Sequence, residues 1–214
     1  MKRISILITL IAALVVMPLT ALALPVQIQF SNVGGTPIDI TNTSGNVPGD
    51  PVVFSYDNSP ASGFGTASIT SGGITGDTGI LDPGPPPIEF NNTLTIDFTG
   101  APIPVIMNLL VTFSMPGMSV NDPFGVMADF FNLGGGVGWV DHVDVPVTIA
   151  SPNGILQYTG PNLFDYVVIN FSTDAPFFEI TDVTYEPVPE PGTIILVAAG
   201  LLGLGGLRFA RRKA

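Results

Sequence analysis

All six lysines and arginines of this 214-residue chain lie within its first three or its last seven residues. The region from Leu24 to Val188 has neither, yet it holds sixteen of the 17 Asp and Glu residues, because only Glu190 lies outside it. His142 is the one side chain there that can become positive. Salt bridges to Lys or Arg are therefore impossible in this region, and its surface potential is negative almost everywhere.

This charge distribution limits the classes of partner that the acidic region can bind. Nucleic acid is excluded, because binding to phosphates requires cationic side chains. Unaided binding to anionic lipid or to acidic polysaccharide is disfavoured for the same reason, whereas multivalent cations, neutral sugars and basic partners remain compatible. The chain has no cysteine, which excludes disulfides, thiolate catalysis and Cys-ligated zinc. The acidic region must therefore rely on its hydrophobic core, and about 165 residues suffice to bury one.

The N-terminus has the pattern of a cleavable secretion signal. Lys2 and Arg3 form a positive start, and an apolar stretch follows from Ile4 to Leu19. Ala21 and Ala23 supply a small-x-small site, which predicts a signal peptide over residues 1–23 with cleavage after Ala23. The alternative is an uncleaved N-terminal anchor.

The C-terminus combines three elements in order. Pro189-Glu190-Pro191 disfavours helix and predicts an extended, accessible segment. The apolar run that follows ends at a basic cluster of Arg208, Arg211, Arg212 and Lys213. A membrane helix over about 193–210 is expected, with the basic cluster in the cytoplasm and the body of the protein outside.

This tail resembles the PEP-CTERM sorting signal of Gram-negative bacteria. Val188-Pro189-Glu190-Pro191-Gly192-Thr193 is similar to the first element of that family, and Arg211-Arg212-Lys213 is similar to its last. The resemblance implies sorting by an exosortase, a membrane-embedded enzyme similar to cysteine transpeptidases, and an association with exopolysaccharide. It covers residues 189–214 only and implies nothing about the rest of the chain. A plain C-terminal anchor behind a proline-rich stalk is the alternative.

Between the two ends, β-branched and aromatic residues alternate with polar ones and are separated by Gly, Pro, Asn, Asp and Ser, which is typical of strands and turns. In Leu94-Thr95-Ile96-Asp97-Phe98, for example, the apolar side chains share one face, as in an antiparallel strand with one solvated face. The predicted strands are Val26–Phe30, Val52–Tyr56, Leu94–Phe98, Val105–Phe113, Val137–Ile149, Tyr166–Phe171 and Phe177–Tyr185.

Seven such strands predict an all-β ectodomain over 24–188, an antiparallel two-sheet sandwich or jelly roll. A parallel β-solenoid is the alternative fold, but it requires a fixed repeat and none is apparent. The stretches Ser31–Pro51 and Asp57–Pro87 are rich in Gly, Ser, Thr and Pro and are expected to be long loops. Met127–Leu133 is expected to form one short helical turn. Pro104 and Pro146 are expected on edge strands, since proline removes a ladder donor.

Few residues point to catalysis. Because His142 is the only histidine, any Ser–His–Asp arrangement must use it, and no serine lies in a Gly-x-Ser-x-Gly elbow. Alternation places His142 and Asp144 on one strand face, with Asp141 on the face of Val143, which favours a solvated pair over a catalytic or metal site. Paired carboxylates could hydrolyse glycosides, but among sixteen acids some will be close by chance. One Trp and four Tyr are few for a sugar-stacking cleft.

Calcium is the one metal with a physical case. Asp50, Asp57, Asp77 and Asp82 lie among turn-forming residues, and hard cations prefer carboxylate and carbonyl oxygens. No Asp-x-Asp-x-Asp-Gly loop is present, so the alternative is that these acids serve solubility and turns.

Three functions remain open. The first is a non-catalytic protein of the cell surface or extracellular matrix, sorted to an exopolysaccharide or biofilm layer. The second is a lectin-like module that binds a neutral glycan, and the third is a glycan-processing enzyme that uses carboxylates. We expect no catalytic residues and no cofactor other than calcium. The expected partners are an exosortase-type enzyme, the membrane through the C-terminal helix, and extracellular polysaccharide.

Overall fold

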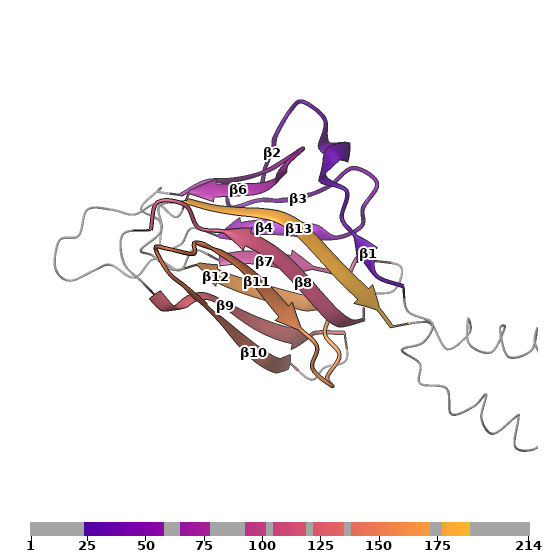
Figure 1. The fold of residues 1–214 in the computed structure, drawn as a ribbon. Coiled ribbons are helices and arrows are strands. Elements are labelled where there is room, and N and C mark those ends of the chain that lie inside the picture. The colour runs from indigo at the N-terminus through magenta and orange to yellow at the C-terminus, as the bar shows by residue number, and fades with distance from the viewer. Residues whose placement is uncertain are drawn as a thin grey trace, which may run out of the picture. The chain divides into compact units, whose positions relative to one another are not determined.

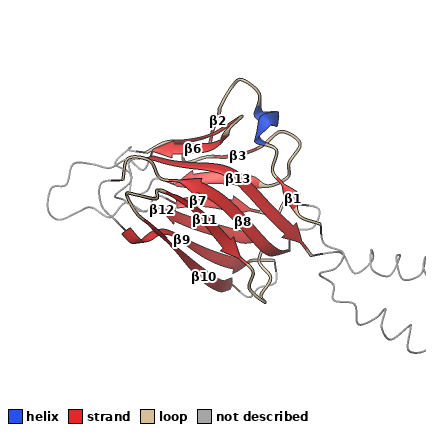
Figure 2. Cartoon of the chain, viewed as in Figure 1, coloured by secondary structure: helices blue, strands red, loops and turns tan. Residues whose placement is uncertain are grey.

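Two antiparallel sheets face each other in the computed structural model of the protein (Figure 1). The structure describes residues 24–57, 65–77, 93–101, 105–118, 122–134, 138–171 and 177–188. Within these ranges strands predominate, with one short 3-10 helix, η2 (Figure 2). The elements are β1 (Val26–Gln27), η2 (Phe30–Val33), β2 (Ile38–Asp39), β3 (Ser44–Asn46), β4 (Val53–Asp57), β5 (Ala67–Thr70), β6 (Gly73–Asp77), β7 (Thr93–Asp97), β8 (Ile106–Ser114), β9 (Asp122–Asn132), β10 (Gly138–Val147), β11 (Asn153–Tyr158), β12 (Tyr166–Phe171) and β13 (Phe177–Pro187).

The chain passes repeatedly from one sheet to the other. The seven-stranded sheet has the order β11-β8-β13-β6-β5-β2, with β1 paired to β13. The six-stranded sheet has the order β10-β9-β12-β7-β4-β3. Because neighbours within a sheet are mostly distant in sequence, each sheet is complete only when the whole domain has folded. Pro25–Pro187 forms one compact unit, and the all-β sandwich predicted from the alternation is confirmed.

The core lies between the two sheets and is rich in aromatic rings. Phe130 stacks on Tyr158 with ring centroids 4.4 Å apart, and Phe164 meets both rings edge-on. Elsewhere in the core, Phe171 of one sheet stacks on Phe178 of the other at 4.0 Å. These contacts join the sheets by burial and ring packing, which a domain without Lys or Arg needs in place of salt bridges.

The strand predictions are largely confirmed. β12 coincides with the predicted Tyr166–Phe171, and β4, β7, β8, β10 and β13 lie within two residues of their predicted bounds. Only Val26–Gln27 of the predicted first strand is extended, since η2 begins at Phe30. Pro146 lies in β10, an edge strand, as predicted, whereas Pro104 lies outside the described residues.

Three expectations were wrong. Met127–Leu133 is not a helical turn, because residues 122–132 form β9, which pairs with β10 on one side and β12 on the other. The stretches expected to be long loops contain β2 and β3, and β5 and β6. β11, for which no strand was predicted, pairs with β8. In each case pairing with strands distant in sequence outweighs the local composition.

No helix within the described ranges is long and apolar enough to cross a membrane. The predicted signal peptide, residues 1–23, and the predicted membrane helix, about 193–210, lie outside those ranges.

Candidate functional site

Three aromatic side chains line up across the outer face of the six-stranded sheet. Phe131 of β9 pairs with Trp139 of β10 on one side and with Tyr166 of β12 on the other. Directly paired residues project from the same face of a sheet. Phe130 and Val167 are buried in the core, so Phe131 and Tyr166 face outward. We call Trp139, Phe131 and Tyr166 the aromatic row.

Two rings of the aromatic row are in contact with each other, and the third is exposed. Phe131 and Tyr166 meet edge-on, with centroids 6.2 Å apart and planes at 73°. Both are half-buried, whereas Trp139, the only tryptophan of the chain, is 58% exposed. One exposed indole on the same face as two half-buried rings concentrates apolar surface there, and such concentrations often mark interaction sites.

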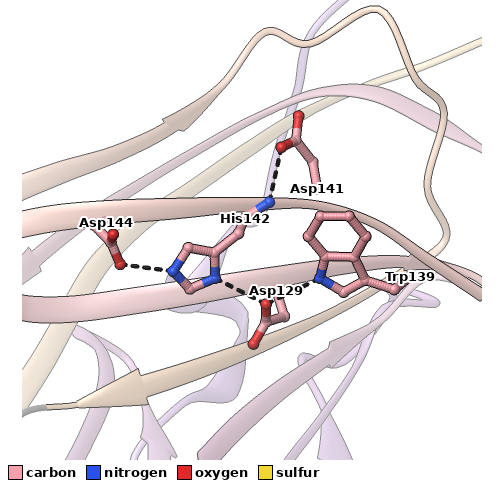
Figure 3. A network of polar contacts seen from close by, with 5 residues as sticks. All are labelled: Asp129, Trp139, Asp141, His142 and Asp144. Atoms are coloured by element: carbon pink, nitrogen blue, oxygen red, sulfur yellow. Dashed lines mark hydrogen bonds and ion pairs between the residues drawn. The ribbon is translucent and has the colours of Figure 1, made fainter.

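A chain of polar contacts runs beside the aromatic row (Figure 3). Nδ1 of His142 lies 2.8 Å from Oδ1 of Asp129, and its Nε2 lies 2.7 Å from Oδ1 of Asp144. The indole Nε1–H of Trp139 donates to the same Oδ1 of Asp129 at 3.2 Å. The hydrogen bond with Asp129 is the main cause that raises the pKa of His142, with Asp144 adding to it and partial burial opposing it. We call Asp129, His142 and Asp144 the histidine clamp.

A β-bulge in β10 brings the clamp and the indole onto one face. Trp139 pairs with Phe131 and Asp141 with Phe130, so Val140 is an extra residue on this strand. Without the bulge, strict alternation from Trp139 would turn His142 toward the core. The solvated pairing of His142 with Asp144 and the separate side of Asp141 agree with the prediction, and Figure 3 shows Asp141 pointing away from the clamp.

A buried carboxylate links the two strands that carry Phe131 and Tyr166. Asp165, 2% exposed, immediately precedes Tyr166. Its Oδ1 accepts a hydrogen bond from the N–H of Leu133 and its Oδ2 one from the N–H of Gly134, both at 2.7 Å. Its own N–H donates to the carbonyl of Phe131 at 2.9 Å. Asp165 thus ties the start of β12 to the end of β9, where Tyr166 and Phe131 pair.

Sequence reasoning identified His142 and Asp144 but missed Asp129, Phe131 and Asp165. Asp129 and Phe131 lie in the segment expected to be helical. No local signal distinguishes Asp165 from the other acids, because its role depends on the chain turning beside it.

The four proposed calcium residues do not form a site within the described ranges. The side chain of Asp50 accepts the N–H of Val52 and stabilises a turn, and its burial raises its pKa. Asp57 and Asp77 end strands of different sheets, β4 and β6. Asp82 lies outside the described residues, and within them no three His, Asp or Glu side chains are grouped so that they could hold a metal ion. The calcium prediction remains a prediction.

Pro189, Glu190, Pro191 and the basic cluster lie outside the described residues, as do Ala21 and Ala23. Residues 187–213 match the model of the PEP-CTERM protein-sorting motif, which confirms the resemblance drawn from the residues. No curated protein matches the chain as a relative.

Several solved structures match the chain at low similarity. A family 29 carbohydrate-binding module complexed with mannohexaose is 14% identical, with a TM-score of 0.37 over 77% of this chain and 92% of that one. A carbohydrate-binding module from Cellvibrio mixtus lichenase 5A, in complex with cellotriose, is 12% identical, with a TM-score of 0.27 over 77% of this chain and 98% of that one. A rhamnosidase from Klebsiella oxytoca is 12% identical, with a TM-score of 0.32 over 47% of this chain and 24% of that one. What these proteins bind does not identify the ligand of this chain.

Proposed function

We propose that this chain, whose tail carries a PEP-CTERM protein-sorting motif, is an exported, non-catalytic surface protein that binds uncharged polysaccharide through the aromatic row. The aromatic row is the observation that carries the proposal. The proposed route is Sec export, transient anchoring by the C-terminal helix with the domain outside, and transfer by an exosortase-type enzyme to the cell surface or its exopolysaccharide matrix.

The chemistry of the aromatic row suits a sugar chain. The two faces of a pyranose ring present C–H groups, which pack on an aromatic ring, while the hydroxyls at the ring edge remain free for hydrogen bonds. The row crosses three neighbouring strands, β10, β9 and β12, so it extends about 10 Å at the usual strand spacing. A surface of that length favours an extended oligosaccharide over a single sugar.

Polar side chains surround the rings and supply partners for hydroxyls. Asp97 of β7 pairs with Tyr166 and continues the row, and its Oδ1 already accepts the N–H and the hydroxyl of Thr99. Two residues further along β12, Val168 pairs with Asp129 of β9 and with Thr95 of β7. Carboxylates accept hydrogen bonds from hydroxyls but repel other carboxylates. Because the region 24–188 has no Lys or Arg, uronic-acid polymers are expected to bind poorly.

The arrangement around His142 supports a non-catalytic role. Both of its ring nitrogens already contact carboxylates, so neither is left to activate a serine or a water molecule. The release of reducing ends from a bound polysaccharide would contradict this part of the proposal.

Fluorescence of the single tryptophan tests the binding site directly. The full chain, purified in a non-glycosidic detergent, is titrated with neutral gluco- and manno-oligosaccharides, and the emission of Trp139 is followed. Binding should shift and quench the emission. Tyr166→Ala should weaken affinity roughly tenfold, since truncating a central aromatic contact of a binding surface typically costs more than about 1 kcal/mol and about 1.4 kcal/mol corresponds to tenfold. Phe177→Ala is the control, because Phe177 is an aromatic residue that is 52% exposed and lies in the other sheet.

Equal effects of the Tyr166 and Phe177 substitutions would place binding elsewhere. No response to any neutral glycan, together with retention on the cell surface, would leave a sorted surface protein without this lectin-like activity.

The tail is tested separately in the host. Without the exosortase-type enzyme, full-length protein should accumulate in the inner membrane, because the short apolar span ends in a basic cluster that retains it there. Unchanged size and location in that strain would make the tail a plain anchor.

A further inference from the structure

We infer that His142 is the positioning residue of the aromatic row: its protonated ring holds Asp129 where that carboxylate fixes the indole of Trp139, and its deprotonation releases the indole and weakens binding. The binding half of this inference rests on the proposed function, whereas the positioning half concerns the protein alone.

The contacts form one continuous chain. Oδ1 of Asp144 contacts Nε2 of His142 at 2.7 Å, and Nδ1 of His142 contacts Oδ1 of Asp129 at 2.8 Å. The same Asp129 oxygen accepts the Nε1–H of Trp139 at 3.2 Å. Figure 3 shows these four side chains following one another, with a dashed contact between each pair of neighbours. The position of the indole is therefore coupled to the imidazole through one shared oxygen atom.

The two His142 contacts require a charged ring. An ionised carboxylate only accepts hydrogen bonds, and a neutral imidazole has one N–H to donate. Only the imidazolium can donate to Asp129 and Asp144 together. After deprotonation one ring nitrogen presents its lone pair to a carboxylate oxygen less than 3 Å away, which is repulsive, so at least one contact opens.

No other cationic side chain of the region 24–188 can replace His142. β10 pairs only with β9 in its sheet, and Asp129 is the charged group of β9 that contacts the ring. On β10 itself, Asp144 contacts the ring, while Asp141 accepts only the backbone N–H of His142. The titratable residue of neighbouring β11 is Tyr158, a phenol whose own pKa is raised by burial and by Asp141. The region 24–188 has no Lys or Arg to compensate the acids once the imidazole is neutral.

Opening either contact loosens Asp129, because the ring then holds this carboxylate by at most one uncharged hydrogen bond. The indole that Asp129 positions is 58% exposed. A side chain held before binding loses less conformational freedom on binding, and immobilising one costs about 0.5–1.5 kcal/mol. That cost corresponds to a loss of affinity of about 2- to 10-fold. Because the pKa of His142 is raised, the imidazole stays charged to a higher pH than an ordinary histidine, and the affinity falls as the pH rises. The row is held below about pH 6.5, the ordinary value for histidine, and is released as the pH rises through the raised value.

The experiment uses the full chain without ligand, followed between pH 5.5 and 9 through its single tryptophan and its single histidine. Fluorescence anisotropy of Trp139 should fall in one transition above pH 6.5, and the imidazole proton resonances of His142 should titrate with the same midpoint. His142→Gln should abolish the fluorescence transition, and Asp144→Asn should shift its midpoint to lower pH. Asp141→Asn, which alters a carboxylate hydrogen-bonded to the backbone N–H of His142 rather than to its ring, should leave the transition in place.

The outcomes separate the two claims. Flat anisotropy while the imidazole titrates, or an unchanged transition in His142→Gln, overturns the positioning role and leaves the proposed glycan binding intact. A transition in the free protein, without glycan binding at any pH, supports the positioning role and overturns the proposed function. A glycan affinity that falls 2- to 10-fold with the same midpoint supports both.

Discussion

Replacing Asp165 should destabilise the domain more than replacing any exposed acid. Asp165→Ala removes both acceptors of the Leu133 and Gly134 N–H groups. Hydrogen bonds to a charged group contribute about 1.5–3 kcal/mol each. Leu133 and Gly134 are themselves exposed, so water can partly replace the lost acceptors. We expect a loss of about 2–4 kcal/mol rather than the full sum, and about half of that for Asp165→Asn, which keeps one carbonyl acceptor.

Thermal unfolding followed by circular dichroism measures this effect. For a domain of this size, 1 kcal/mol corresponds to about 2–4 °C, so Asp165→Ala should melt roughly 5–15 °C below the native protein. Asp182→Ala is the control, because Asp182 is a half-buried acid of β13 that accepts hydrogen bonds from the side chains of Gln27 and Thr184 and from no backbone N–H that the structure describes. Its effect should stay within about 0.5 kcal/mol. Equal melting temperatures for the two variants would refute the anchoring role of Asp165.

Four further predictions follow from other parts of the chain. The His142 contacts should stabilise the fold fully below about pH 6.5, and this stabilisation should be lost as the pH rises through the raised pKa of His142. Urea unfolding across pH 5.5–9 measures the change in the free energy of unfolding. A free energy of unfolding that rises over this range would contradict the prediction. Gly73→Ala should lower the free energy of unfolding by about 2–4 kcal/mol, because Gly73 has φ +138° and an added Cβ would lie 2.0 Å from the carbonyl oxygen of Ile180. An unchanged midpoint of urea unfolding would contradict this prediction. Monovalent salt at tenths of molar should raise the melting temperature by screening the acids, whereas a larger rise with calcium at fixed ionic strength would indicate the calcium site. N-terminal sequencing of the mature protein should begin at Leu24, and a retained Met1 would exclude cleavage after Ala23.

Much of the architecture follows from local patterns. Alternation alone predicted β12 and nearly all of β4 and β7, because a strand with one buried face repeats every two residues wherever its partners lie. The tail motif is equally local, and its match at residues 187–213 needed no folded context. By contrast, β5 and β6 are made of Gly, Ser and Thr as much as of apolar residues. Their extended form depends on pairing with each other and with β13.

The binding face could not be predicted in the same way. The sequence by itself determined that the domain has one histidine, one tryptophan and no Lys or Arg between its ends. Any binding site in it therefore had to be acidic and to have His142 as its one possible cationic donor. Only the tertiary structure placed Phe131 between Trp139 and Tyr166, because β9 pairs with strands on both sides. The extra residue Val140 placed Trp139 and His142 on the same face, whereas strict alternation from residue 139 to residue 142 would have placed them on opposite faces. A bulge is set by the register between two strands, and that register is decided by packing across the whole sheet.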